Sequence, residues 1–172
     1  MLFIKKCFFF FLSALIPVTA TAQVCQATTI PATSPTKQFS INSNGTVTDI
    51  KTGLIWKKCF EGQSSLDCSD KGLVYTWQQA LEQAQIINKS GGFAGYDDWR
   101  LPNVKELVSI TEKQCVFPGI NLILFPNTPS QKYWTSSPVA NKSENAWYVH
   151  FDGGHSGYIT KSTFNYVRLV RG

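Results

Sequence analysis

Hydrophobic and polar residues alternate in short runs near both ends of the chain, which is the pattern of strands with one buried face. Residues 39–41 and 46–48 alternate on either side of Asn44-Gly45, a dipeptide typical of hairpin turns. A second turn at 51–53 leads into the apolar residues 54–56. We therefore expect antiparallel hairpins over this part of the chain.

The middle of the chain carries two stretches with the spacing of helices. The first begins near Thr76, which forms a capping-box pattern with Gln79. Its apolar positions recur at helical spacing up to the run Ser90-Gly91-Gly92, at Trp77, Ala80, Leu81, Ala84 and Ile87. A second, shorter helix follows Leu101-Pro102, with Asn103 as its cap and Glu106 three residues later.

Residues 115–145 follow neither period. They hold four of the eight Pro and one short strand candidate at 133–135, so we expect a long irregular loop region. Because loops on a rigid scaffold commonly carry ligand contacts, we place the binding surface in 116–145 and the adjoining hairpin.

The end of the chain alternates again over 147–151, turns at Gly153-Gly154 and returns through two strands, at 157–159 and 166–170. Strands, then two helices, then strands predict an α+β domain with a mostly antiparallel sheet.

The first 22 residues have the composition of a secretory signal peptide. Lys5 and Lys6 precede an apolar stretch over 7–18, and Ala20-Thr21-Ala22 has the small-x-small pattern of a cleavage site. A membrane anchor is the competing interpretation, but it needs about 20 apolar residues and this stretch is shorter. We therefore predict cleavage between Ala22 and Gln23, no membrane-spanning segment afterwards, and a protein that is periplasmic, secreted or on the cell surface.

The remaining chain divides into two parts. Residues 23–38 are rich in Thr, Pro and Ser and are expected to form an extended lead-in. Residues 39–172 are expected to form one domain.

Export would place the four remaining Cys in an oxidising compartment, where disulfides form. Cys59 and Cys68 bracket a short loop and are the natural pair, which leaves Cys25 to pair with Cys115. A catalytic thiol or a zinc site is the alternative. Neither spacing is Cys-x-x-Cys and no Cys has a His close in sequence, so the pattern favours two disulfides.

Composition narrows the classes of function. Hydrophobic residues make up 43% of the chain and charged residues 16%, which is too apolar and too weakly charged for a disordered protein. Without Lys5 and Lys6, 14 Lys and Arg stand against 11 Asp and Glu, and no block of like charge remains. This mildly basic balance argues against a nucleic-acid partner.

A series of short motifs runs through residues 39–172. They are Gly45-Thr46-Val47-Thr48-Asp49, Thr52-Gly53-Leu54 with Trp56, Thr76-Trp77 with Ala80-Leu81, Asp97-Asp98-Trp99-Arg100-Leu101-Pro102-Asn103-Val104-Lys105-Glu106-Leu107, Phe125-Pro126-Asn127-Thr128, Tyr133-Trp134-Thr135-Ser136-Ser137-Pro138 and Val167-Arg168-Leu169-Val170-Arg171-Gly172. In this order they resemble the Lcl C-terminal-like domain family, and the Trp-Arg-Leu-Pro block is the most specific of them.

The resemblance implies an exported bacterial domain with a C-type-lectin-like fold, in which two helices flank a sheet and a long loop region holds the ligand site. The naming member of the family is an adhesin whose domain binds sulfated glycans. This chain has no collagen-like Gly-x-y region, and it lacks the Glu-Pro-Asn or Gln-Pro-Asp tripeptide with which true C-type lectins hold calcium and sugar. The family brings no established catalytic residues to carry over.

Four residues are candidates for contacting such a ligand. Lys132, Lys142 and Lys161 fall on no apolar stripe, so we expect all three to be exposed and to meet sulfate groups. Trp134 adjoins the irregular region and is the best placed of the five Trp to stack on a sugar ring. The alternatives are three solvated lysines and a Trp in the core.

Asp98, Arg100 and Glu106 are interpreted as structural. A guanidinium group offers a fixed fork of donors, which suits a tie from Arg100 to Glu106 or to Asp98 that braces the link between the helices. A binding loop is the alternative interpretation.

His150, Asp152 and His155 are the one constellation with metal-ligand chemistry. If Gly153-Gly154 is a two-residue turn, Asp152 lies opposite His155, and His150 points to the same face. Two imidazoles and a carboxylate suit a divalent transition metal. The alternative is a solvated outer face of a hairpin, and no other cofactor is expected.

These observations together predict a lectin-like domain that recognises glycans at the cell envelope or a host surface. A structural or protein-interaction module of the envelope is the alternative, and homo-oligomers are compatible with both. The nearest pattern to a nucleophile elbow, 154–158, misses Gly-x-Ser-x-Gly by its last residue, and no Gly-rich phosphate loop is present. We therefore expect no enzyme activity.

Overall fold

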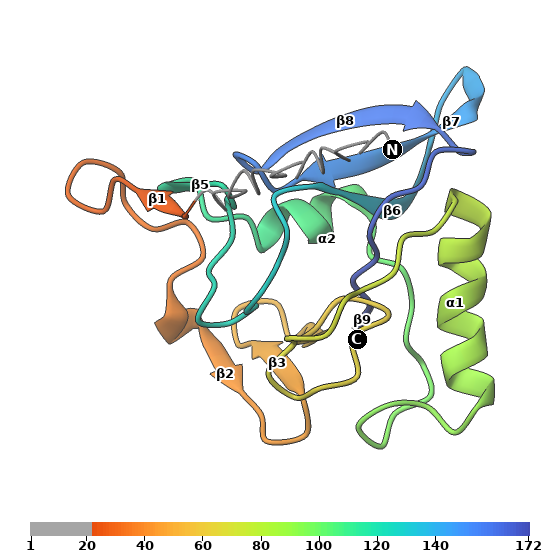
Figure 1. Cartoon of the computed structure of the whole chain (residues 1–172), viewed down its shortest axis with the longest axis horizontal. Helices are drawn as coiled ribbons and strands as arrows, with labels where there is room; N and C mark the ends of the chain where they lie inside the picture. The colour runs from red at the N-terminus through yellow and green to blue at the C-terminus, as the bar shows by residue number, and fades with distance from the viewer. Residues whose placement is uncertain (1–21) are drawn as a thin grey trace, which may run out of the picture.

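The computed structural model describes residues 22–172 (Figure 1). The predicted signal peptide lies almost wholly outside the described residues. Within them the chain is α+β, as expected, with two α-helices and antiparallel strands arranged in small sheets. No helix of the described residues has both the length and the apolar composition needed to cross a membrane.

The first larger sheet has the strand order β2-β3-β4-β9. Its strands are Phe39–Ile41, Thr46–Asp49, Ile55–Lys57 and Val170–Arg171. Both predicted hairpin turns are present, and Gly45 (φ 82°) and Gly53 (φ 76°) supply the left-handed conformations that the turns require. The expected last strand over 166–170 is shorter than predicted, because only its end joins this sheet.

The second larger sheet has the order β6-β7-β8, with strands Lys132–Val139, Lys142–His150 and His155–Thr160. It corrects the prediction of an irregular region, because residues 132–145 belong to one long hairpin. Pro138 hid this hairpin in the sequence, since proline usually interrupts a strand. Here β6 is an edge strand, and Pro138 lies at a shift in the pairing register.

The two helices begin where the capping signals predict. α1 spans Trp77–Lys89, and Thr76 and Gln79 exchange both bonds of a capping box. α2 spans Val104–Ser109, and Asn103 and Glu106 do the same. These boxes satisfy N–H groups that the first turn of a helix leaves without partners.

Two buried clusters hold the layers together. The first joins the four-stranded sheet, α2 and one face of β6-β7-β8, through side chains such as Trp56, Leu107, Tyr133 and Val149. The second joins α1 to the opposite face of the same sheet, through Ala80, Trp134 and Ala146 among others. In Figure 1, α2 accordingly lies between the two larger sheets, while α1 stands on their flank.

The lead-in before residue 39 is docked onto the body of the protein. β1 (Val24–Cys25) pairs with β5 (Cys115–Val116), and the short 3-10 helix η1 (Thr36–Gln38) precedes β2. The buried carboxylate of Glu112 accepts the backbone N–H groups of Thr33 and Ser34, each at 3.0 Å. Glu112 thereby attaches the lead-in to the segment that follows α2.

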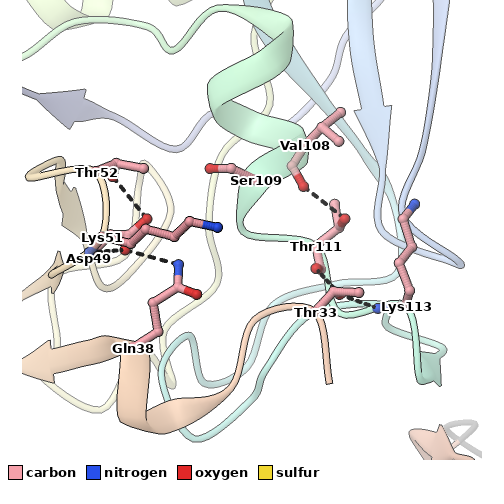
Figure 2. A pocket seen from close by; sticks show the side chains of 9 residues that line it. All are labelled: Thr33, Gln38, Asp49, Lys51, Thr52, Val108, Ser109, Thr111 and Lys113. Atoms are coloured by element: carbon pink, nitrogen blue, oxygen red, sulfur yellow. Dashed lines mark hydrogen bonds between the residues drawn. The ribbon is translucent and has the colours of Figure 1, made fainter. Parts of the chain in front are cut away.

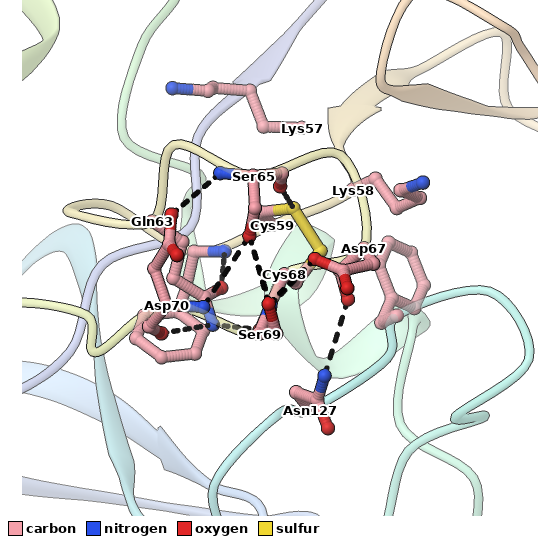
Figure 3. The surroundings of a disulfide bond; sticks show 12 residues. Lys57, Lys58, Cys59, Gln63, Ser65, Asp67, Cys68, Ser69, Asp70 and Asn127 are labelled. Carbon is pink, nitrogen blue, oxygen red and sulfur yellow. Dashed lines mark hydrogen bonds between the residues drawn. A yellow bond between two sulfur atoms is a disulfide. The ribbon is translucent and has the colours of Figure 1, made fainter.

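Both predicted disulfides are present. Cys25–Cys115 joins β1 to β5, and Cys59–Cys68 closes the loop that follows β4. Figure 3 shows the second bridge inside a network of Ser and Asp side chains, and Asn127 donates to the backbone carbonyl of Asp67 at 3.2 Å. The disulfides indicate a stabilised domain of an extracellular or periplasmic compartment.

Candidate functional site

The three candidate lysines lie at separate places on the three-stranded sheet. Lys132 stands directly opposite His150, whereas Lys142 begins the far end of β7. Eight residues of β7 separate these two ends, about 26 Å at the rise of a strand. Lys161 follows β8 and lies near the Lys142 end, where its Nζ donates to the carbonyl of Ser143 at 2.5 Å.

Each of the three lysines lies over an aromatic ring. The Nζ atoms of Lys132, Lys142 and Lys161 lie 5.0, 4.3 and 4.4 Å from the ring centroids of Tyr148, Tyr158 and Trp77, respectively. Lys142 is exposed, but Lys132 and Lys161 are half-buried, which corrects the expectation that all three are fully solvated. The rings attract the ammonium groups and draw the aliphatic stems down onto the surface.

Trp134 is not available to a ligand. Its side chain is fully buried, and its indole N–H donates to the carbonyl of Tyr75 at 2.8 Å. The prediction that Trp134 stacks on a sugar ring is therefore wrong. Its strand packs against α1, and a helix covers the ring that the sequence placed beside a loop.

A cavity of about 550 Å³ opens instead at the beginning of α1. It is lined by Thr76, Trp77, Gln78, Leu81, Lys161 and Ser162. It combines an indole ring, one ammonium group, two hydroxyl groups and an amide. Lys161 is one of the predicted ligand contacts, but Trp77 is not, because it falls on the apolar stripe of its helix and that pattern predicts a core residue.

The backbone fixes the geometry of this cavity. The N–H of Trp77 donates to the carbonyl of Lys161 at 3.0 Å, and the N–H of Lys161 donates to the carbonyl of Glu144 at 2.8 Å. The indole N–H of Trp77 donates to the carbonyl of Thr135 at 2.8 Å. The indole ring is therefore held against β6 and the ammonium group against β7. Because these side chains are already fixed, they lose less conformational entropy when a ligand binds.

Asp98, Arg100 and Glu106, in and around the Trp-Arg-Leu-Pro block, have structural partners. Arg100 contacts Glu106 through two parallel bonds of 2.8 and 2.9 Å, as expected, and Asp98 pairs with Arg171 instead. Burial alone would raise the pKa of Glu106, but the bonds from Arg100 and from the N–H of Asn103 hold it below its usual value. The bond from Arg171 lowers the pKa of Asp98. The Arg171–Asp98 pair and the bond from Arg100 to the carbonyl of Gly172 join the last residues of the chain to the segment between the two helices.

His150, Asp152 and His155 do come together, but through a different turn from the one predicted. His150 pairs directly with His155 across β7 and β8, so the loop has four residues and Asp152 lies within it. Gly154 takes a left-handed φ of 71° there. Burial alone would raise the pKa of Asp152, but the bonds from His150 and from the N–H of Gly153 lower it.

A second cavity, of about 330 Å³, lies between the lead-in, the β3–β4 turn and the end of α2 (Figure 2). Its polar groups mostly bond to one another. Asp49 accepts bonds from Gln38 and Thr52, and the hydroxyl of Thr33 donates to the carbonyl of Thr111. These hydrogen bonds join the lead-in to the β3–β4 turn and to the segment after α2, so we do not take the second cavity as a candidate binding site.

The buried charge of Arg168 has no signal in the sequence. The guanidinium of Arg168 is completely buried and donates to the carbonyls of Lys57 and Lys58 and to the hydroxyl of Thr128. Burial lowers the pKa of Arg168 to about 10. The group joins the segment before β9 to the end of β4 and to the 125–128 loop, so its role is structural.

Comparison with known families agrees with this arrangement of motifs. A family model described as the Lcl C-terminal domain matches residues 45–171. No curated protein matches the sequence.

Proposed function

Since this chain belongs to the Lcl C-terminal domain family, we propose that it is an exported binding domain that recognises anionic glycans through the cavity at the beginning of α1. We also propose that its fold is of the C-type-lectin-like kind, in which two helices flank a sheet. In this proposal it acts by binding rather than by catalysis, which is supported by the structural pairing of Arg100 with Glu106 and of Asp98 with Arg171 in its most specific motif.

The observation that carries the proposal is the pairing of Trp77 with Lys161 in one cavity. An indole ring offers an apolar surface to the C–H groups of a sugar, and an ammonium group offers charge to a sulfate or carboxylate. The hydroxyl of Ser162 and the amide of Gln78 line the same cavity and suit sugar hydroxyl groups.

The other two lysines have a secondary role in this proposal. Lys142 lies over Tyr158, which pairs with Trp147, whereas the cavity lies on the α1 side of the sheet. Lys132 is at the opposite end of β7. Both add to the long-range attraction of a polyanion, but neither lines the cavity.

Binding to a heparin-like polymer tests the proposal, with its desulfated form as the matched ligand. We expect the protein to prefer the sulfated form and to lose affinity steeply with salt, because the Debye length falls from about 10 Å at 0.1 M to about 3 Å at 1 M. Equal binding of both polymers, or no binding of either, contradicts the proposal.

Variants locate the site. Lys161→Ala should weaken binding about tenfold, the effect of losing a hydrogen bond to a charged group, while Lys161→Arg should largely retain it. Lys89→Ala removes the same charge from the other end of α1 and should change affinity little. If Lys161→Ala binds as the parent does, the cavity is not the site.

A further inference from the structure

Two histidines and an aspartate lie close together at the end of the three-stranded sheet farthest from the proposed glycan cavity. We propose that His150, Asp152 and His155 bind a divalent transition-metal ion of the zinc class. The proposal does not depend on the proposed glycan function, because the two sites share no residue.

The donor atoms of the three side chains already converge. The imidazole rings stack with centroids 5.3 Å apart and planes inclined by 22°. The Oδ1 atom of Asp152 lies 2.6 Å from Nδ1 of His150 and 3.2 Å from Nδ1 of His155. One potential ligand atom from each residue lies within 4.8 Å of the others. Ligand atoms around a tetrahedral zinc ion are about 3.3 Å apart, given bonds of about 2.0–2.1 Å, so side-chain rotation alone would admit the ion.

The backbone holds these residues in place without the ion. His150 and His155 form the last pair of the β7–β8 ladder, and the N–H of Gly154 closes the turn on the carbonyl of His150 at 3.0 Å. The carbonyl of Asp152 accepts the N–H of Phe117 at 2.8 Å, so the loop is tied to a neighbouring segment.

Gly154 is required for this packing. A Cβ atom there would lie 2.8 Å from the Cβ of Thr111, and the residue also has a positive φ. A ligand set held in this way loses little conformational freedom when an ion binds.

The chemistry of the donors selects the kind of ion. Imidazole nitrogen suits zinc, copper and nickel, whereas calcium and magnesium prefer sites built wholly from oxygen. His155 is 59% exposed, so the remaining coordination positions face the solvent. Three protein ligands with an open position are also the arrangement that allows an outside group to coordinate the ion.

Two lysines near the cluster bear on the affinity. Lys132 stands opposite His150, but its Nζ lies over the ring of Tyr148, and Lys113 donates to the carbonyl of Gly154. Neither ammonium group is a metal ligand, but both place positive charge near the cluster, and this charge repels a metal cation. We therefore expect weaker binding than at a four-ligand structural zinc site.

The composition of the chain makes the test unusually direct. The sequence contains two His, and both belong to this cluster, so every imidazole signal in an NMR spectrum reports on it. Titrating the oxidised protein with Zn²⁺ should shift both imidazole signals and saturate at one ion per chain, while Ca²⁺ should leave them unchanged. Calorimetry on the same samples gives the affinity.

Two single variants and one control complete the experiment. Asp152→Asn and His155→Asn should each weaken Zn²⁺ binding by at least about tenfold, because each removes a ligand. Glu144→Gln removes an exposed carboxylate from the other end of β7 and should leave binding unchanged. Imidazole signals that do not respond to Zn²⁺ overturn the proposal, as does binding that survives in both ligand variants. In either case the cluster is a hydrogen-bonded turn only.

Discussion

The four-stranded sheet and the three-stranded sheet use their polar residues in different ways. Around β2-β3-β4-β9, the charged side chains of the family motifs point at other parts of the protein, as in the pairs Arg100–Glu106 and Arg171–Asp98 and in the buried Arg168. Around β6-β7-β8, lysines lie on aromatic rings near solvent and two histidines meet a carboxylate in a turn.

This difference separates what identifies the family from what we expect to bind ligands. The motif residues maintain the framework, and a change in them should act mainly on stability. Of the residues that line the cavity, Thr76, Trp77 and Leu81 fall within a family motif. The polar residues Gln78, Lys161 and Ser162 lie outside the motifs, and so does the histidine cluster. In this chain the motifs are therefore a better guide to the fold than to the polar residues expected to contact a ligand.

The largest loss of stability is expected from the longer disulfide. In the chain-entropy model, replacing Cys25 and Cys115 by Ser, which opens a loop with a sequence separation of 90, should lower the free energy of unfolding by about 4–5 kcal/mol. Replacing Cys59 and Cys68, with a separation of 9, should cost about 2.5–3 kcal/mol. Chemical denaturation of both double variants measures the difference. Equal losses would show that loop length does not govern these bridges.

Removing the buried charge should come next. Arg168→Met keeps most of the volume but leaves the carbonyls of Lys57 and Lys58 without their donor, so we expect about 3 kcal/mol of destabilisation. Arg171→Met, at the more exposed pair with Asp98, should cost at most about 1 kcal/mol. Comparable denaturation midpoints for the two variants would contradict the structural role assigned to Arg168.

Acid should release the lead-in. Burial alone would raise the pKa of Glu112, but the N–H groups of Thr33, Gln114 and Ser34 hold it below its usual value. A lowered pKa in the folded state means that the contribution is complete above the unfolded pKa, near 4.3, and is lost as the pH falls through the folded value.

Glu112→Gln should reproduce this loss at neutral pH, at a cost of about 1.5–3 kcal/mol, because a neutral amide accepts these bonds less well. Glu82→Gln, on the exposed face of α1, is the control and should have little effect. Hydrogen exchange of residues 23–35 measures the release directly. Protection that persists in Glu112→Gln would show that the disulfide alone holds the lead-in.

Much of the framework was predictable because its signals are local. Both helix starts followed from capping residues three positions apart, and the tie from Arg100 to Glu106 joins residues six positions apart. The long hairpin over 132–150 was not found, because Pro138 at an edge strand has the same sequence signal as a loop. The role of Arg168 was not found because its acceptors lie 40 to 111 positions away in the sequence.

The binding residues were predicted as residue types but not as a site. The three lysines share no sequence spacing that reveals which aromatic ring each one contacts. Trp77 falls on an apolar helical stripe, which predicts a core residue. Only the tertiary structure, which places Lys161 beside α1, shows that Trp77 lines a cavity. Likewise the histidine cluster needed the register of β7 and β8, which a four-residue loop sets differently from a two-residue turn.

The indole N–H signals of the five Trp test the central claim most directly, because they report on the framework and the cavity in one NMR spectrum. Addition of a sulfated oligosaccharide should shift the signal of Trp77 saturably, while those of the buried Trp56, Trp99 and Trp134 move little. A Trp77 signal that stays fixed at saturation, while the imidazole signals of the opposite end respond, would contradict the placement of the glycan site at α1.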